Sequence, residues 1–235
     1  MTPARFACLI PAHDEADRIG AVLRAVIGHP LIDRVLVIDD GSGDATARVA
    51  RDAGAEVLSL TPNRGKTGAL AAGIGLVDTS HLVLIDADLT GLTSDDLTRL
   101  IVPVAAGQAD VTISLRGNAP RTWRALGVDY ISGERVIPRA LIAPHLHRLA
   151  DLPRFGFEVF LNDRLAEARL TVRIVGWPGV ASPAKSAKRG LWRGLRADAA
   201  MIGDILRTIP LRRVLRQIAY LRRGGASTET VAPRV

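Results

Sequence analysis

The sequence predicts an α/β fold with a mostly parallel central sheet flanked by helices, and three observations support this prediction. Short apolar runs rich in β-branched residues alternate with helical segments of about ten residues through the first half of the chain. These runs show little polar alternation, which is typical of strands covered on both faces. A polar loop follows each run. Strands and helices that alternate in this way form right-handed crossovers into a parallel sheet, so the loops should meet at one edge.

The elements of the first half follow in order. We expect a helix that Asp14 caps and that runs to Ile27, and a second helix that ends at Ala53 before Gly54. A third helix is predicted over residues 69–77. The expected strands, which are short and apolar, cover residues 6–10, 35–38, 56–60 and 83–85.

The second half has a looser pattern. The segment from Thr93 to Asp96 resembles a capping box variant at a helix start. Residues 130–135 predict a loop and the start of a helix, and another helix begins around Gly156. Two more strands are predicted over residues 110–114 and 171–175.

The composition is that of an ordinary globular protein, with 48% apolar and 23% charged residues. We expect one large domain over residues 1–180, a basic amphipathic helical extension over 181–223 and a disordered tail over 224–235. Cys8 is the only cysteine, so no intrachain disulfide can form and a reducing compartment is expected. No apolar run approaches the roughly 18 residues of a spanning helix, and the first run is too short for a signal peptide. We therefore expect a cytoplasmic location, either free or in peripheral contact with the inner face of the cell membrane.

Two aspartates, Asp86 and Asp88, directly follow the fourth predicted strand. Ligands of open α/β sheets collect outside the carboxyl ends of the strands, so both carboxylates should lie at this rim. There they could share a hard cation and, through it, a phosphate. The alternative is that one aspartate caps the next helix and the other is only solvated.

Three other polar loops follow predicted strands and belong to the same edge, namely residues 11–15, 39–40 and 63–66. For Asp39 and Asp40 the alternative is a turn and helix cap, and Asp44 suits a cap better than a ligand.

Two familiar nucleotide motifs are absent because the spacing of their residues does not fit. Leu60 stands where a phosphate-binding P-loop ending at Gly65 to Thr67 needs a glycine, and residues 73–75 lack the third glycine of a dinucleotide fingerprint.

The four loops together resemble the motifs of the family 2 glycosyltransferases with a GT-A fold. The matching segments are residues 10–15, 37–46, 63–73 and 86–88, and the resemblance extends over about residues 5–180. It implies transfer of a sugar from a nucleoside-diphosphate sugar to a hydroxyl or phosphate acceptor, with inversion as the family's usual outcome. The Gln-x-x-Arg-Trp signature of processive polysaccharide synthases is absent.

The resemblance implies a donor site at this edge of the sheet. Pro11 and Ala12 would lie alongside the base, and Lys66 would contact the nucleotide. Glu15 and Asp40 would accept hydrogen bonds from base N–H or ribose hydroxyl groups.

It also implies that Asp86 and Asp88 bind Mg²⁺ or Mn²⁺, with Ala87 between them against the donor. Asp88 would then serve catalysis through the ion, which neutralises the departing diphosphate. Small relatives commonly carry a histidine soon after the position of Val180, but residues 181–183 are Ala-Ser-Pro here. The third ligand of the ion therefore stays open, and water or donor phosphate would fill its place.

Three features of the second half also have implied roles, one in cofactor binding and two on the acceptor side. Arg116 corresponds to a phosphate-contacting arginine of the dolichyl-phosphate mannose synthase branch, with a solvated loop arginine as the alternative. Residues 132–135 resemble the acceptor-side Ser-Gly-x-Arg segment of small family members. Glu158 is the candidate base that deprotonates an acceptor hydroxyl, with an ordinary helix N-terminal acid as its alternative. A phosphate acceptor, which is already ionised, would need no base.

The positive net charge of +7 is concentrated near the C-terminus, where residues 185–223 hold eleven Lys or Arg and two acids. Apolar residues from Leu211 to Leu221 follow helical spacing, with arginines on the remaining positions. This helix could lie on an anionic membrane surface near a lipid-linked acceptor, or pack on the domain or on a partner subunit of a homo-oligomer. Nucleic acid is not an expected partner, because aromatic residues are only 4% and no recognition motif occurs.

Two other functions compete with glycosyl transfer. A sugar-phosphate nucleotidyltransferase also handles nucleotide sugars, but its glycine-rich Gly-x-Gly-x-Arg loop is absent after the first strand. A non-catalytic protein that binds a nucleotide sugar or a membrane could retain the same fold. Loss of transfer on replacement of Asp88 would argue against this second alternative.

Overall fold

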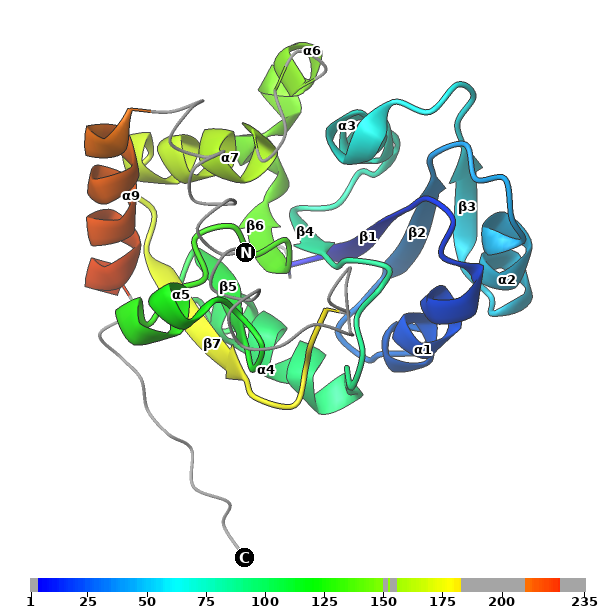
Figure 1. Ribbon diagram of the computed structural model, residues 1–235, viewed down its shortest axis with the longest axis horizontal. Coiled ribbons are helices and arrows are strands. Elements are labelled where there is room, and N and C mark those ends of the chain that lie inside the picture. Colours follow the sequence, from blue (N-terminus) through cyan, green and yellow to red (C-terminus); the bar gives the residue numbers. More distant parts are fainter. Residues whose placement is uncertain (1–3, 150–151, 153–155, 183–209, 225–235) are drawn as a thin grey trace, which may run out of the picture.

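The computed structural model describes residues 4–149, 152, 156–182 and 210–224, and its centre is one seven-stranded sheet (Figure 1). The strands lie in the order β3-β2-β1-β4-β6-β5-β7, and only β6 runs antiparallel to its neighbours. The predicted α/β fold with a mostly parallel sheet is therefore confirmed. The strands are β1 (Phe6–Ala12), β2 (Arg34–Asp39), β3 (Glu56–Ser59), β4 (His81–Leu84), β5 (Val111–Arg116), β6 (Arg135–Pro138) and β7 (Val172–Trp177).

The central strand β1 is buried on both faces. Ala7 and Leu9 belong to the core on one face of the sheet, whereas Cys8 and Ile10 belong to the core on the other. A strand in this position needs apolar residues at every step, because successive side chains point to opposite faces. This explains the unbroken apolar run at the start of the sequence.

Helices cover both faces of the sheet, as Figure 1 shows. One face is covered by α1 (Ala16–Val26), α2 (Thr46–Asp52) and α4 (Ser94–Ala105), and the other by α3 (Gly65–Leu76), α6 (Leu146–Leu149) and α7 (Gly156–Glu167). The remaining elements are α5 (Arg121–Leu126), the 3₁₀ turns η1 (Arg139–Leu141) and η2 (Ala143–His145), and α9 (Leu211–Gly224).

The capping box predicted at the start of α4 is confirmed. The Asp96 N–H donates to Thr93 Oγ1 at 3.2 Å, and the Thr93 N–H donates to Asp96 Oδ2 at 3.0 Å. The two bonds satisfy backbone donors that the first turn of a helix leaves without partners.

The cap predicted at Asp14 is wrong. Asp14 Oδ1 accepts from the Gly43 N–H at 2.8 Å, and the Ala16 N–H at the start of α1 donates to Asp44 Oδ2 at 3.1 Å. The loops after β1 and β2 therefore exchange hydrogen bonds and fix each other. A sequence pattern cannot reveal a cap that comes from a neighbouring loop.

Helix α3 begins at Gly65, four residues before the predicted start at residue 69. The Arg64 N–H donates to the buried carboxylate of Asp40 at 2.7 Å, and Gly65 adopts a φ of 73° that glycine reaches without steric cost. Lys66 consequently lies in the first turn of a helix and not in a loop.

The helix start predicted over residues 130–135 is also wrong, because residues 135–138 form β6 between β4 and β5. Val136 and Ile137 are buried in the cores on opposite faces of the sheet. Arg135 obscured this strand in the sequence, since a fully buried arginine is rare. Its guanidinium donates to the carbonyls of Ser132 and Tyr130 at 2.7 and 3.2 Å, so the charged group keeps hydrogen-bond partners.

The C-terminal helix α9 packs on the domain through its apolar stripe. Val214, Ile218 and Leu221 are buried in the core that also contains residues of α7 and β7, whereas Leu211 and Leu215 are 55% and 56% exposed. No helix in the described part of the chain is long and apolar enough to span a membrane. Most of the basic segment predicted upstream of this helix, residues 183–209, and the tail 225–235 lie outside the described residues.

Candidate active site

The loops after β1, β2 and β4 and the first turns of α3 enclose a cavity of about 350 Å³. Ala12 lies beside Asp39 in the pairing of β1 with β2, and Leu9 lies beside Leu84 in the pairing of β1 with β4, so these loops emerge at one edge. The cavity contains every predicted donor-site and metal residue except Arg116. Its lining residues are Pro11, Ala12, His13, Glu15, Asp40, Lys66, Ala69, Asp86, Ala87 and Asp88.

Asp40 has a structural part as well as a place in the cavity wall. Its side chain is buried, with Oδ1 bound to the Arg64 N–H, and its carbonyl accepts from Asn63 Nδ2 at 2.9 Å. These bonds tie the end of β2 to the start of α3. The turn that follows β2 is held instead by Asp39, whose Oδ1 accepts from the Ser42 N–H at 3.2 Å.

Glu15 stands at the start of α1, where its side chain accepts from Arg18 Nε at 2.5 Å. Its own N–H donates to Thr46 Oγ1 at 2.8 Å, which connects it to the loop after β2. The pair with Arg18 is partly exposed, and such pairs contribute little to stability. The Glu15 carboxylate can therefore exchange this partner for a ligand at small cost.

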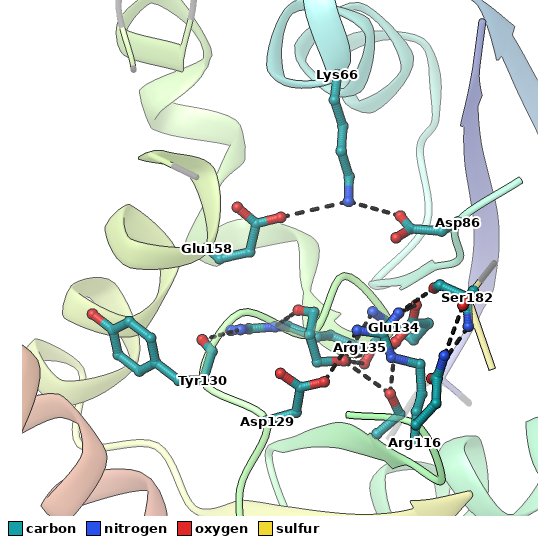
Figure 2. Close-up of polar contacts among 12 residues, drawn as sticks. Lys66, Asp86, Arg116, Asp129, Tyr130, Glu134, Arg135, Glu158 and Ser182 are labelled. Carbon is teal, nitrogen blue, oxygen red and sulfur yellow. Dashed lines mark hydrogen bonds and ion pairs between the residues drawn. The ribbon is translucent and has the colours of Figure 1, made fainter. Parts of the chain in front are cut away.

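Lys66 lies between two carboxylates that come from different parts of the chain (Figure 2). Its Nζ is 2.7 Å from Asp86 Oδ1 and 3.5 Å from Glu158 Oε1. Burial alone would lower the pKa of Lys66, but the charges of Asp86 and Glu158 outweigh it and raise that pKa. Burial likewise opposes ionisation of Asp86, and the ammonium reverses this and lowers the pKa of the carboxyl.

The pKa of Asp88 is shifted in the opposite direction to that of Asp86. Burial is the main cause that raises its pKa, and the negative charges of Asp86 and Glu15 raise it further. A cation shared by Asp86 and Asp88 would relieve this repulsion, because an opposite charge favours the ionised form of a carboxyl group.

A second space, too narrow to admit a water molecule, adjoins the cavity, and Pro11, Lys66 and Asp86 line both. Glu158, in the first turn of α7, lies in this space and is 6% exposed. The other lining residues are Leu70, Leu84, Ile85, Ser132, Gly133, Arg135 and Phe157. The segment from Ser132 to Arg135 and Glu158 are therefore brought to one place, next to the cavity that holds Asp86.

Arg116, the last residue of β5, lines neither space. Its Nη2 donates to Asp129 Oδ2 at 3.1 Å, its Nη1 lies 3.5 Å from Glu134 Oε1, and it also donates to Ser182 (Figure 2). Burial alone would lower the pKa of Arg116, but the carboxylates of Glu134 and Asp129 outweigh it and raise that pKa. Any contact of this arginine with a phosphate has to compete with these partners.

A family model described as glycosyl transferase family 2 matches residues 7–144, more than half of the chain. The chain belongs to this family. The matched part includes all residues that line the cavity, whereas Glu158 and α9 lie beyond it.

Curated relatives that match a part of this family 2 chain are named as glycosyltransferases. The 4,4'-diaponeurosporenoate glycosyltransferases of Staphylococcus aureus strains USA300 and NCTC 8325 are 38% identical over 98 residues. The match covers 40% of this chain and 26% of each relative. The chain thus matches about a quarter of the length of these relatives.

Solved structures confirm the GT-A fold of the family 2 chain. Glucosyl-3-phosphoglycerate synthase from Mycobacterium tuberculosis in complex with phosphoglyceric acid superposes with a TM-score of 0.67 at 21% identity, over 92% of this chain and 80% of that one. The complex of that enzyme with Mn²⁺, uridine-diphosphate-glucose and phosphoglyceric acid gives a TM-score of 0.66 at 22% identity, with the same coverage.

The residues of the family 2 site suit a divalent cation that is shared with a substrate. Within residues 4–149, 152, 156–182 and 210–224, no three His, Cys, Asp or Glu side chains gather around one point. Mg²⁺ is usually held by one or two carboxylates together with substrate phosphates, and Asp86 and Asp88 supply such a pair. The Asp86 carboxylate already pairs with one cationic group, the ammonium of Lys66.

Several residues of the site were not assigned a role from the sequence. His13 and Ala69 belong to motifs that were recognised, so their positions after β1 and in α3 were available as signals. Asp129 offered no signal, because its complete burial beside Arg116 depends on contacts that are distant in the sequence.

Proposed function

We propose that this glycosyltransferase carries out metal-dependent transfer of a sugar from a nucleoside-diphosphate sugar to a hydroxyl or lipid-phosphate acceptor, with inversion. The observation that carries the proposal is the cavity at the carboxyl edge of the sheet, with its apolar wall at Pro11 and Ala12 and its carboxylates. A nucleoside diphosphate needs a surface for the base, acceptors for ribose and base hydrogens, and a cation for the diphosphate. The lining offers all three kinds of group.

On the donor side, Asp86 and Asp88 would hold Mg²⁺ or Mn²⁺ together with the diphosphate. When bound, the ion supplies Lewis-acid stabilisation of the departing diphosphate. Glu15 and Asp40 would orient the nucleoside, with Ala87 against the donor, and Lys66 would add a positive charge near the phosphates. The bound Mn²⁺ and uridine-diphosphate-glucose named for the Mycobacterium tuberculosis synthase support this chemistry.

On the acceptor side, Glu158 would remove the proton from an acceptor hydroxyl as it attacks the sugar. The carboxylate adjoins the donor cavity and comes within 3.5 Å of Lys66, which itself contacts Asp86. A general base has to lie within reach of the reacting atoms, and this placement supports the role. A lipid-phosphate acceptor would not need it.

A sugar-phosphate nucleotidyltransferase is the competing activity, and membership of glycosyl transferase family 2 argues against it. The decisive experiment is a thermal-shift screen of nucleotide sugars with and without Mn²⁺. We expect one nucleoside-diphosphate sugar to raise the Tm by several degrees only when Mn²⁺ is present, because a ligand bound to the native state stabilises it. Stabilisation by a nucleoside triphosphate together with a sugar phosphate would favour the nucleotidyltransferase, and no shift with any nucleotide sugar would contradict the proposal.

We further propose that α9 brings the enzyme to an anionic membrane surface, such as the inner face of the cell membrane. The apolar stripe of α9 is occupied by the core, so contact has to involve the opposite side, where Leu211, Arg212, Leu215 and Arg216 are exposed. Exposed arginines near anionic lipids contribute about 1 kcal/mol each. Removal of the whole helix would expose the core and would not test this role.

The double replacement of Arg212 and Arg216 by Gln is expected to weaken co-sedimentation with phosphatidylglycerol vesicles by about tenfold or more. The matched control replaces Arg48 and Arg51, two exposed arginines on α2, and should bind as the wild type does. Phosphatidylcholine vesicles should capture none of the three proteins. Equal sedimentation of the two double variants would contradict a membrane role for α9.

A further inference from the structure

Lys66 forms ion pairs with two carboxylates that have different roles in the proposed reaction. Its ammonium lies 2.7 Å from Asp86 Oδ1, on the proposed metal ligand, and 3.5 Å from Glu158 Oε1, on the proposed base (Figure 2). The side chains of Lys66, Asp86 and Glu158 are 40%, 25% and 8% exposed, so water screens both pairs in part. Lys66 is the residue of α3 that lines both the donor cavity and the narrow space beside Glu158.

Gly133 provides a second observation on the same contact. A Cβ at this position would come within 2.7 Å of Lys66 Nζ and 2.8 Å of both carboxylate oxygens of Asp86. The φ angle of Gly133 is outside the left-handed region, so the backbone conformation does not require glycine there. A side chain at this position would have to displace the ion pair of Lys66 and Asp86, because that pair packs directly against the backbone of the loop before β6.

We propose that Lys66 occupies the cation position at Asp86 until the donor arrives, so that the divalent ion binds together with the donor and not ahead of it. This inference rests on the proposed function. Without nucleotide, an ion that approaches Asp86 has to displace an ammonium whose ion pairs, among the residues that the structure describes, are with Asp86 and Glu158. With a nucleoside diphosphate present, the phosphates offer the displaced ammonium a new partner.

The balance of charge also favours binding of the ion together with the donor. A divalent ion alone adds two positive charges beside Lys66, and the repulsion is strong at distances of a few ångströms in a partly buried site. An ion that comes with a diphosphate adds little net charge. Lys66 therefore sets a preference for the loaded donor over the free ion, and it protects the site from metal that arrives without substrate.

The test measures Mn²⁺ affinity by electron paramagnetic resonance of the free ion, with and without UDP or GDP. Wild-type protein should bind Mn²⁺ weakly alone and more tightly with the nucleotide. We expect Lys66→Met to bind Mn²⁺ alone roughly tenfold more tightly than wild type does, which is the scale of one charge-assisted hydrogen bond. Addition of the nucleotide should increase the Mn²⁺ affinity of this variant less than that of wild type. Lys66→Arg retains the charge and should bind the free ion as weakly as wild type does.

Unchanged affinity of Lys66→Met for Mn²⁺ in the absence of nucleotide would overturn the proposal. Thermal melting verifies that each variant is folded, and Lys66→Gln, which hydrogen-bonds without a charge, carries the same expectation if the Met variant is unstable. Failure of the proposed function itself has a different signature. In that case wild-type protein would bind no Mn²⁺ even with either nucleotide, whereas the inference about Lys66 fails when wild type binds the free ion as tightly as it does with nucleotide, or when the variants do not differ from wild type.

Discussion

Replacement of Asp86 by asparagine is expected to weaken metal-dependent binding of the nucleotide-sugar donor by at least about 100-fold. The side-chain amide keeps its shape but loses the charge that a hard cation prefers, and even indirect supports of a metal site cost about 10- to 100-fold when removed. Asp86 follows the last residue of β4 by two positions and lies in the wall of the cavity. Isothermal titration calorimetry of the donor in Mn²⁺ and in EDTA measures the metal-dependent part.

Asp88→Asn provides the partner experiment, since Asp86 also pairs with Lys66 and its replacement disturbs that contact. Both variants should lose the same metal-dependent part of the affinity. The control is Asp17→Asn, an equivalent change at an exposed acid in the first turn of α1 that does not line the cavity. Metal-dependent binding that survives in both site variants would exclude the assigned ion position.

The donor cavity was largely predictable because it depends on local patterns and one topological rule. Apolar runs locate the strands, and parallel pairing places the residues that follow them at one edge, so Glu15, Asp40 and Asp86 could be grouped from the sequence. No knowledge of individual side-chain contacts was needed. The capping box at Thr93 belongs to the same class, since its partners are three residues apart.

The acceptor side was less predictable because its contacts join distant parts of the chain. Lys66 and Glu158 meet through α3 and α7, and β6 inserts between strands that precede it in the sequence. Arg135 made β6 resemble a loop, and its bonds to two backbone carbonyl groups and to Asn162 Oδ1 explain why a charge is tolerated there. Arg116 was assigned to phosphate, yet its buried partners Asp129 and Glu134 were invisible to local patterns.

Helix α9 illustrates a limit of amphipathic patterns. A stripe at the spacing of Val214, Ile218 and Leu221 fits a membrane surface and a protein core equally well, because both bury one apolar side of a helix. The structure places these residues in the core. What the pattern did not indicate is the buried Gln217, which accepts from Tyr130 Oη at 2.5 Å and donates to Asp163 Oδ1 at 2.6 Å. A polar residue with such partners fixes the helix on α7 and on the segment before β6.

Replacement of Glu158 by glutamine is expected to lower kcat by about 10²- to 10⁴-fold for a hydroxyl acceptor, the usual contribution of a general base. Donor affinity should change little, because Glu158 lines the narrow space and not the donor cavity. The variant retains the shape of the side chain but cannot accept the proton. Steady-state kinetics with the donor identified by the thermal-shift screen, and calorimetry for its binding, separate the two effects.

The alternative role of Glu158, an acid that stabilises the first turn of α7, gives a different result. In that case Glu158→Gln would lower stability by about 0.3–1 kcal/mol and leave kcat unchanged. Glu167→Gln is the matched control, since Glu167 lies on the same helix, is exposed and pairs with Arg164. If the variant retains full turnover, Glu158 is not the base, and an acceptor that is already ionised, such as a lipid phosphate, becomes the better explanation of the site.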